Sequence, residues 1–144
     1  YHDFAAEATE RYLSGMYEVF QSSNTVYENY APDFLEPGQP AKADFVGWSG
    51  CGPIQLLFEN VMGLQPSGVT GTLVWHLRRT DRHGVEQLKL GENVVSVRCG
   101  ARDSREAPAE LEISSKKPFT LVVHHPSGKH TFALAAGQHH LVIE

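Results

Sequence analysis

The pattern of apolar and polar positions changes once along the chain, near residue 69. Before this point, apolar residues recur at three- and four-residue steps over 3–21 and again over about 52–62, which predicts two amphipathic helices. After it, apolar and polar residues alternate in short segments separated by turn signals, which predicts an antiparallel β-sandwich. We therefore expect two domains, 1–68 and 69–144.

The second half is expected to contain about seven short strands. A Pro-Ser-Gly-Lys turn at 126–129 predicts a hairpin, and 100–108 reads as a polar loop. We interpret 65–68, Gln-Pro-Ser-Gly, as a connector between the two domains. The expected strands cover 72–78, 85–90, 93–99, 109–114, 119–125, 130–135 and 139–143.

The stretch between the two predicted helices, residues 24–50, is rich in aromatic residues and is called the aromatic loop below. Loops longer than about 12–15 residues are uncommon in compact domains and tend to be functional or disordered. Disorder is disfavoured here because the aromatic side chains are costly to leave in water. Glu28 lies among them, and a carboxylate set between aromatic side chains is typical of a sugar site. These aromatic residues are Tyr27, Tyr30, Phe34, Phe45 and Trp48.

Charge is distributed unevenly around a formal net charge of −5. Residues 1–68 carry nine acidic and two basic side chains, a balance of −7, whereas residues 69–144 carry eight acidic and ten basic side chains, a balance of +2. The acidic first half argues against a nucleic-acid partner. No stretch reaches about 18 apolar residues, so we expect no membrane span. The two cysteines, Cys51 and Cys99, are expected to be free thiols.

Two segments of the aromatic loop carry a resemblance to a known family. Glu28-Asn29-Tyr30, followed by Phe-Val-Gly-Trp-Ser-Gly at 45–50, resembles the C-terminal end of the six-hairpin, (α/α)6-barrel glycoside hydrolases. Glycoside hydrolase family 63 and the mannosylglycerate-hydrolase-like enzymes are the most similar, and family 37 trehalases more distantly. The resemblance covers residues 1–68, and over 69–144 it rests on position alone.

The resemblance implies a fold, a reaction and site residues. The fold would be α+β, with two terminal helices of an (α/α)6 barrel followed by a small antiparallel β-sandwich cap. The reaction would be hydrolysis of an α-glycosidic bond in an oligosaccharide or small glycoside with inversion, without metal or cofactor. Glu28 would be the general base, and Asn29, Tyr30 and Trp48 would contact the carbohydrate substrate.

The same resemblance implies that the machinery is incomplete in this chain. An inverting glycosidase needs a carboxylic acid and a carboxylate roughly 6.5–9.5 Å apart. The aspartic acid that protonates the leaving oxygen belongs to an earlier hairpin of the family, and no position here matches its motif. We therefore expect the remainder of the barrel to lie upstream, as the partner of residues 1–68.

Two other interpretations remain open. The chain could be a non-catalytic module that binds carbohydrate or stabilises a larger enzyme. It could also serve a different six-hairpin chemistry, such as unsaturated-uronide hydrolysis, whose base would be an aspartate. Asp33, Glu36 and Asp44 are interpreted as solvated loop acids.

The remaining candidates for chemistry are the thiols and histidines. We expect Cys51 to be a buried small residue at a helix start rather than a nucleophile. Adjacent histidines on a strand point to opposite faces, so each pair offers one ligand to a given site. No cysteine or carboxylate spacing supports a metal site, and we interpret these histidines as surface or edge residues. They are His124, His125, His130, His139 and His140.

Overall fold

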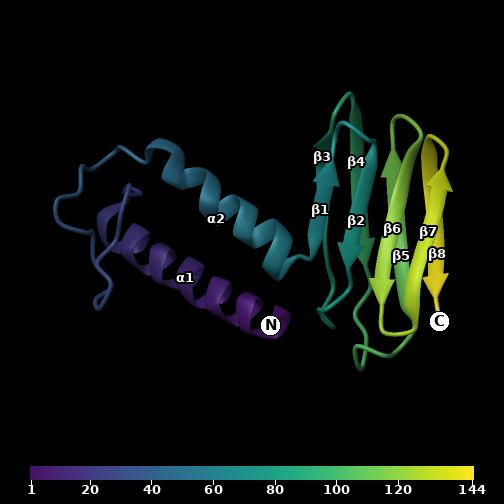
Figure 1. The fold of residues 1–144 in the computed structure, drawn as a ribbon, viewed down its shortest axis with the longest axis horizontal. Helices are drawn as coiled ribbons and strands as arrows, with labels where there is room; N and C mark the ends of the chain where they lie inside the picture. Colours follow the sequence, from purple (N-terminus) through teal and green to yellow (C-terminus); the bar gives the residue numbers. More distant parts are fainter. The chain divides into compact units, whose positions relative to one another are not determined.

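The computed structural model describes the backbone of residues 1–144 and every side chain except those of Trp48 and Ser49. The chain forms two compact units, Tyr1–Val61 and Met62–Glu144, which we call the helical unit and the sandwich unit (Figure 1). Each is described separately.

The helical unit consists of two helical segments joined by the aromatic loop. Helix α1 (His2–Ser23) ends at Asn24, whose left-handed backbone (φ 55°) lets its N–H reach Phe20 O at 2.7 Å. After the loop come a 3₁₀ turn η1 (Gly47–Gly50), helix α2 (Cys51–Leu56) and a π-helical turn η2 (Leu57–Val61). α1 packs against η2, where Asn60 Nδ2 donates to the buried Thr9 Oγ1 at 3.1 Å.

The sandwich unit contains two four-stranded sheets that lie face to face (Figure 1). One sheet has the order β1-β2-β6-β7 and the other β3-β4-β5-β8. The strands are β1 (Leu64–Ser67), β2 (Thr72–His76), β3 (His83–Leu90), β4 (Asn93–Cys99), β5 (Ala109–Ser115), β6 (Phe119–His125), β7 (Gly128–Leu134) and β8 (Gly137–Ile143).

Strict alternation of buried and less buried residues builds the core between the sheets. In β4, β5 and β6 every second residue is buried, because successive side chains of a strand point to opposite faces. The indole of Trp75 is completely buried, and its Nε1 donates to Met62 O at 3.0 Å. The other fully buried large side chains of this unit are Leu64, Leu73, Val95, Val97, Leu111, Leu121, Val123 and Ile143.

The expected fold, two terminal helices of an (α/α)6 barrel followed by an antiparallel sandwich, is wrong. The described chain is mostly β, with eight strands in two sheets and two helices. α2 has six residues before its hydrogen bonding shifts to the π pattern of η2, so the expected helix over 52–62 does not form as one regular α-helix. Ile54 and Leu57 in this segment are exposed, so the apolar stripe read from the sequence is not covered by the described residues of this chain.

Two details of the sandwich also differ from the sequence-based expectation. Residues 65–67 of the expected connector 65–68 belong instead to strand β1, which pairs antiparallel with β2. β2 pairs with β6 in parallel, with Trp75 opposite Val123, so the sandwich is not wholly antiparallel. The alternation pattern predicts which residues face the core, but it carries no information about strand direction.

Candidate functional site

The aromatic loop is ordered by hydrogen bonds between its two arms. Thr25 Oγ1 donates to Asp44 Oδ1 at 2.6 Å, and Gly38 N donates to Asn29 O at 3.1 Å. Tyr30 and Pro37 form an isolated antiparallel bridge. These contacts satisfy backbone and side-chain polar groups that an irregular segment would otherwise leave to water.

Glu28 is exposed and lies beside the second of the two family-like segments. Gly47 has φ +53°, and a Cβ placed on it would lie 3.9 Å from Glu28 Oε1 and 3.6 Å from two ring atoms of Phe45. The Glu28 carboxylate and the Phe45 ring therefore both lie near the backbone of Gly47, which has no side chain. A side chain at position 47 would enter this space and would also be strained by the positive φ.

Asn29 holds the bend of the loop. Its Nδ2 donates to Pro40 O at 3.2 Å, and its backbone O accepts from Gly38 N. A Cβ on Gly38 would lie 2.1 Å from Asn29 Oδ1, so a larger residue at position 38 would displace the Asn29 side chain. The sequence suggested Asn29 as a neighbour of the sugar, and the structure places its amide on Pro40.

Tyr30 packs toward helix α1. Its hydroxyl accepts from Tyr27 N at 3.2 Å, and the two rings meet edge to face with centroids 6.3 Å apart. Tyr30 also borders a hollow of about 140 Å³ together with Tyr12 and Phe34. Burial, and secondly the neighbouring Tyr30, raise the pKa of Tyr12 above its usual value. Ligand pockets usually measure about 300–1,000 Å³, so this hollow is too small to hold a sugar by itself.

Trp48 is the fourth residue that the resemblance selects, and its side chain lies outside the described residues. Its backbone belongs to η1, directly after Gly47. The structure thus brings Glu28 close to Gly47 and places Asn29 and Tyr30 in the framework of the loop.

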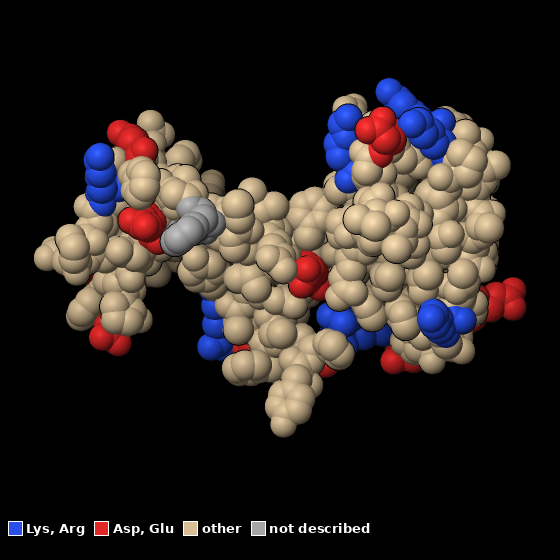
Figure 2. Space-filling model, turned by 45° about the horizontal axis from the view of Figure 1, so that its top comes forward, with Lys and Arg blue, Asp and Glu red and all other residues tan. Residues whose placement is uncertain are grey.

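The helical unit carries much exposed apolar surface. Large apolar side chains protrude from α1, from the aromatic loop and from α2, including Phe4 at 72%, Phe34 at 70% and Ile54 at 61% exposure. On the face drawn in Figure 2, charged side chains of this unit are scattered over a mostly uncharged surface. The number of these exposed side chains makes the helical unit a candidate interaction surface.

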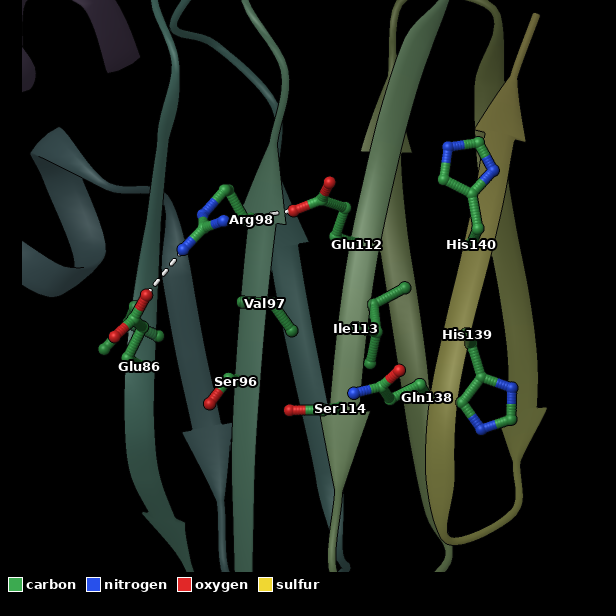
Figure 3. Close-up of a pocket in the computed structure, with 11 residues that line it drawn as sticks. Glu86, Ser96, Val97, Arg98, Glu112, Ile113, Ser114, Gln138, His139 and His140 are labelled. Atoms are coloured by element: carbon green, nitrogen blue, oxygen red, sulfur yellow. Dashed lines mark hydrogen bonds and ion pairs between the residues drawn. The ribbon is translucent and has the colours of Figure 1, made fainter.

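A second candidate site is a groove of about 650 Å³ on the outer side of the sheet β3-β4-β5-β8 (Figure 3). Its most prominent feature is Arg98, which forms ion pairs with Glu86 at 2.5 Å and Glu112 at 3.1 Å. Among the described residues that line the groove there is no Phe, Tyr or Trp. The groove therefore offers polar contacts but no aromatic platform for a pyranose ring.

The histidines of the sandwich unit are engaged in local packing. His76 and His124 stack with centroids 4.4 Å apart and an interplanar angle of 11°. His125 is buried, not at the surface as expected, and its ring nitrogens contact Ser127 Oγ and Ala107 O. Within the described part of the chain, no group of three or more His, Cys, Asp or Glu is arranged to hold a metal ion.

The two cysteines are free, as expected from their surroundings in the sequence. Cys51 is exposed at the start of α2, so the expectation that it is buried is wrong. Cys99 is buried in β4, and burial raises the pKa of its thiol. The described residues include no helix with the length and apolar character needed to cross a bilayer.

Sequence reasoning missed the contact between Thr25 and Asp44. The two residues are 19 positions apart in an irregular segment, so no periodicity relates them. The sequence offered one weak signal, the aspartate at position 44, because aspartate is among the few non-glycine residues that readily adopt the positive φ (+60°) found there. An aspartate at such a position is compatible with a tight turn, but it does not show that its carboxylate accepts a hydrogen bond from Thr25.

Comparison with known proteins gives no family assignment. No family model matches the chain, and no curated protein or solved structure was found to be similar to it.

Proposed function

We propose that the aromatic loop supplies the general base of an inverting glycoside hydrolase that acts on an α-linked oligosaccharide or small glycoside, with Glu28 as the base. The observation that carries this proposal is the convergence of Glu28 and Phe45 on the bare backbone of Gly47. Two segments that resemble glycosidase motifs in sequence thus meet in space around one carboxylate.

The local chemistry suits activation of water. A general base must reach a water molecule that attacks the anomeric carbon from the face opposite the leaving group. Glu28 is exposed, so its carboxylate is accessible to water, and the exposed Phe45 ring, which borders Gly47 as Glu28 does, would offer apolar surface to the C–H groups of a sugar. Tyr30 and Asn29 act in this proposal mainly by shaping the loop that presents Glu28.

The proposal also requires a general acid, and no position of this sequence matches the family's motif for that residue. The general acid, an aspartic acid in the resembling family, would come from another part of a longer polypeptide. The exposed apolar side chains of the helical unit support this, because burying them needs a further protein surface. The acidic balance of residues 1–68 continues to argue against nucleic acid as the partner.

A second function is favoured by a separate observation, the groove of about 650 Å³ on the sandwich unit. A non-catalytic module could bind a polar ligand there through Arg98, Ser114 and Gln138. We rank it second because Arg98 already pairs with two carboxylates and the lining lacks an aromatic ring.

The proposal is tested by following the stereochemistry of hydrolysis in the full-length protein. A panel of α-linked gluco- and manno-disaccharides would be incubated with it, and the first-formed anomer would be identified by proton NMR. An inverting mechanism predicts that the β-anomer appears first and then equilibrates. Release of the α-anomer would contradict the role of Glu28 as a base for water, and binding without hydrolysis would favour the non-catalytic module.

A further inference from the structure

We propose that Thr25 and Asp44 form a clamp that positions Phe45 and Gly47 against Glu28, so that Asp44, an exposed loop acid as expected, is also a positioning residue. This inference rests on the proposed function, and it adds two residues to the site. Its basis is the hydrogen bond of 2.6 Å from Thr25 Oγ1 to Asp44 Oδ1, which joins the two arms of the aromatic loop.

The Thr25 side of the clamp is anchored to helix α1. Asn24 ends the helix through its N–H on Phe20 O, and Ser23 Oγ donates to Val19 O at 2.8 Å. Ser23 Oγ also contacts Thr25 O at 3.3 Å. Thr25 is therefore fixed relative to the helix, and Glu28 follows it by only three residues.

The Asp44 side of the clamp directs the chain into the site. Asp44 has φ +60°, a conformation that most side chains avoid, and the next residue is Phe45. The Lys42 ammonium lies 5.8 Å from the centroid of the Phe45 ring, and two atoms of this ring would lie 3.6 Å from a Cβ placed on Gly47. The hydrogen bond between Thr25 and Asp44 thus links the turn that precedes Phe45 to the chain segment that leads to Glu28.

A second hydrogen bond joins the two arms of the aromatic loop at its outer bend. Asn29 Nδ2 donates to Pro40 O at 3.2 Å, which holds the outer bend. This contact lies before the turn at Asp44 and does not fix residues 45–47. Loss of the Thr25–Asp44 bond should therefore free Phe45 and Gly47 to move away from Glu28 while the outer bend remains closed.

The clamp would act on catalysis through geometry. Displacement of a positioning group by about 1 Å can cost on the order of a hundredfold in rate. Because the clamp touches neither the sugar nor the reacting atoms, its loss should lower kcat more than it raises KM. A merely structural role in an exposed loop would leave both unchanged.

Four substitutions in the full-length protein separate the hydrogen bond from the backbone conformation. Asp44→Gly keeps the positive φ and removes the acceptor, whereas Asp44→Asn keeps both the positive φ and an acceptor oxygen. Thr25→Val removes the donor with little change of shape, and Thr25→Ser retains it. Asp33→Asn, at an exposed acid of the same loop, is the matched control.

The variants would be compared by kcat and KM on the substrate found with the α-linked panel, and by hydrogen exchange at 26–30 and 45–47. We expect Thr25→Val and Asp44→Gly each to lower kcat roughly ten- to a hundredfold and to accelerate exchange at both segments. The double variant should be no worse than either single one, because both remove the same bond. Asp44→Asn, Thr25→Ser and Asp33→Asn should stay close to the unmodified protein.

The outcomes distinguish the clamp from the proposed function. Hydrolysis by the unmodified protein with unchanged kcat in Thr25→Val and Asp44→Gly would overturn the clamp and leave the function standing. Additive losses in the double variant would likewise overturn it. Absence of hydrolysis by the unmodified protein on the panel would overturn the proposed function and, with it, the positioning role of Asp44.

Discussion

At the scale of single residues, His83 shows how burial sets a protonation state in the sandwich unit. Its Nδ1 lies 2.8 Å from Asp81 O and can donate only when it carries the proton, which leaves Nε2 as the bare nitrogen. Nε2 is buried without a hydrogen-bond partner among the described residues, and the ring meets Trp75 edge to face at 5.5 Å. Burial is the main cause that lowers the pKa of His83 below its usual value, and the hydrogen bond to Asp81 O opposes it.

This lowered pKa predicts an acid-dependent loss of stability. Below about pH 6.5 the unfolded chain binds a proton at His83 while the folded chain stays neutral. The free energy of unfolding should therefore fall as the pH decreases from about 6.5 toward the lowered folded-state pKa, and should become flat below it. His83→Phe should flatten this slope below about pH 6.5, measured by denaturant unfolding at several pH values.

His140→Gln is the control for this measurement, because His140 is an exposed residue on the outer side of β8. The His140→Gln variant should show the same dependence of the free energy of unfolding on pH as the unmodified protein. A slope that persists in His83→Phe would show that other groups carry the acid sensitivity. Asp81, whose pKa Arg79 lowers by a side-chain hydrogen bond, would add a loss only at more acidic pH, below about 4.

At the scale of elements, the loop after β4 is held down by one buried guanidinium. Arg102 Nη2 donates to Leu77 O at 3.1 Å and Arg79 O at 2.8 Å, and Nη1 donates to Arg105 O at 2.9 Å. The sequence indicated only a polar loop over 100–108. The structure shows that this loop is fixed to the end of β2 and the residues after it.

Removing the guanidinium should destabilise this corner of the sandwich. Arg102→Met leaves several carbonyl groups without their donor, and the free energy of unfolding should fall by on the order of 3 kcal/mol. Limited proteolysis of the variant should cut within 101–108, which should resist cleavage in the unmodified protein. Lys116→Met, at an exposed position, serves as control, and equal cleavage of both variants would contradict the anchoring role.

The elements also show what the sequence could and could not predict. Alternation identified most strands of the sandwich, because each of them buries one face. It missed β1, whose Gln-Pro pair reads as a loop although Leu64 is completely buried opposite Trp75. The parallel pairing of β2 with β6 was missed because the intervening strands β3, β4 and β5 belong to the other sheet, which no local pattern reveals.

The candidate site divides in the same way. Composition predicted an ordered loop with Glu28 among aromatic side chains, and the loop is ordered in the structure. The proximity of Glu28 to Gly47 was not predicted by any spacing in the sequence. The bond between Thr25 and Asp44 was not predicted at all, since an irregular loop has no period from which such a contact could be read.

At the scale of the whole molecule, the two units differ in how much they bury. The buried side chains of the helical unit include Thr9, Val19 and Val61, whereas the sandwich unit has a continuous core of completely buried residues. Local stability follows buried apolar contact. The helical unit is therefore the less stable of the two when the chain stands alone.

Hydrogen exchange of the 144-residue chain should show this difference directly. Amides of β4, β5 and β6 should exchange slowly and together, at the rate of global unfolding. Amides of α1 should exchange faster by at least about tenfold, because the exposed side chains of this helix, such as Phe4 and Tyr17, contribute little to the free energy that keeps the helix folded. Equal protection of α1 and β5 would contradict the lower stability of the helical unit. It would also weaken the argument that a further protein surface covers this unit.

The most direct test of the central claim is the turnover of Glu28→Gln in the full-length protein. The amide keeps the shape of the side chain and loses the proton acceptor, so kcat should fall about 10²–10⁴-fold while KM changes little. Asp33→Asn, in the same loop, should cost less than about tenfold. Melting temperature should be kept or rise, because active-site carboxylates are often retained at a cost in stability. A Glu28→Gln protein that turns over within about tenfold of the unmodified one would contradict the assignment of Glu28 as general base.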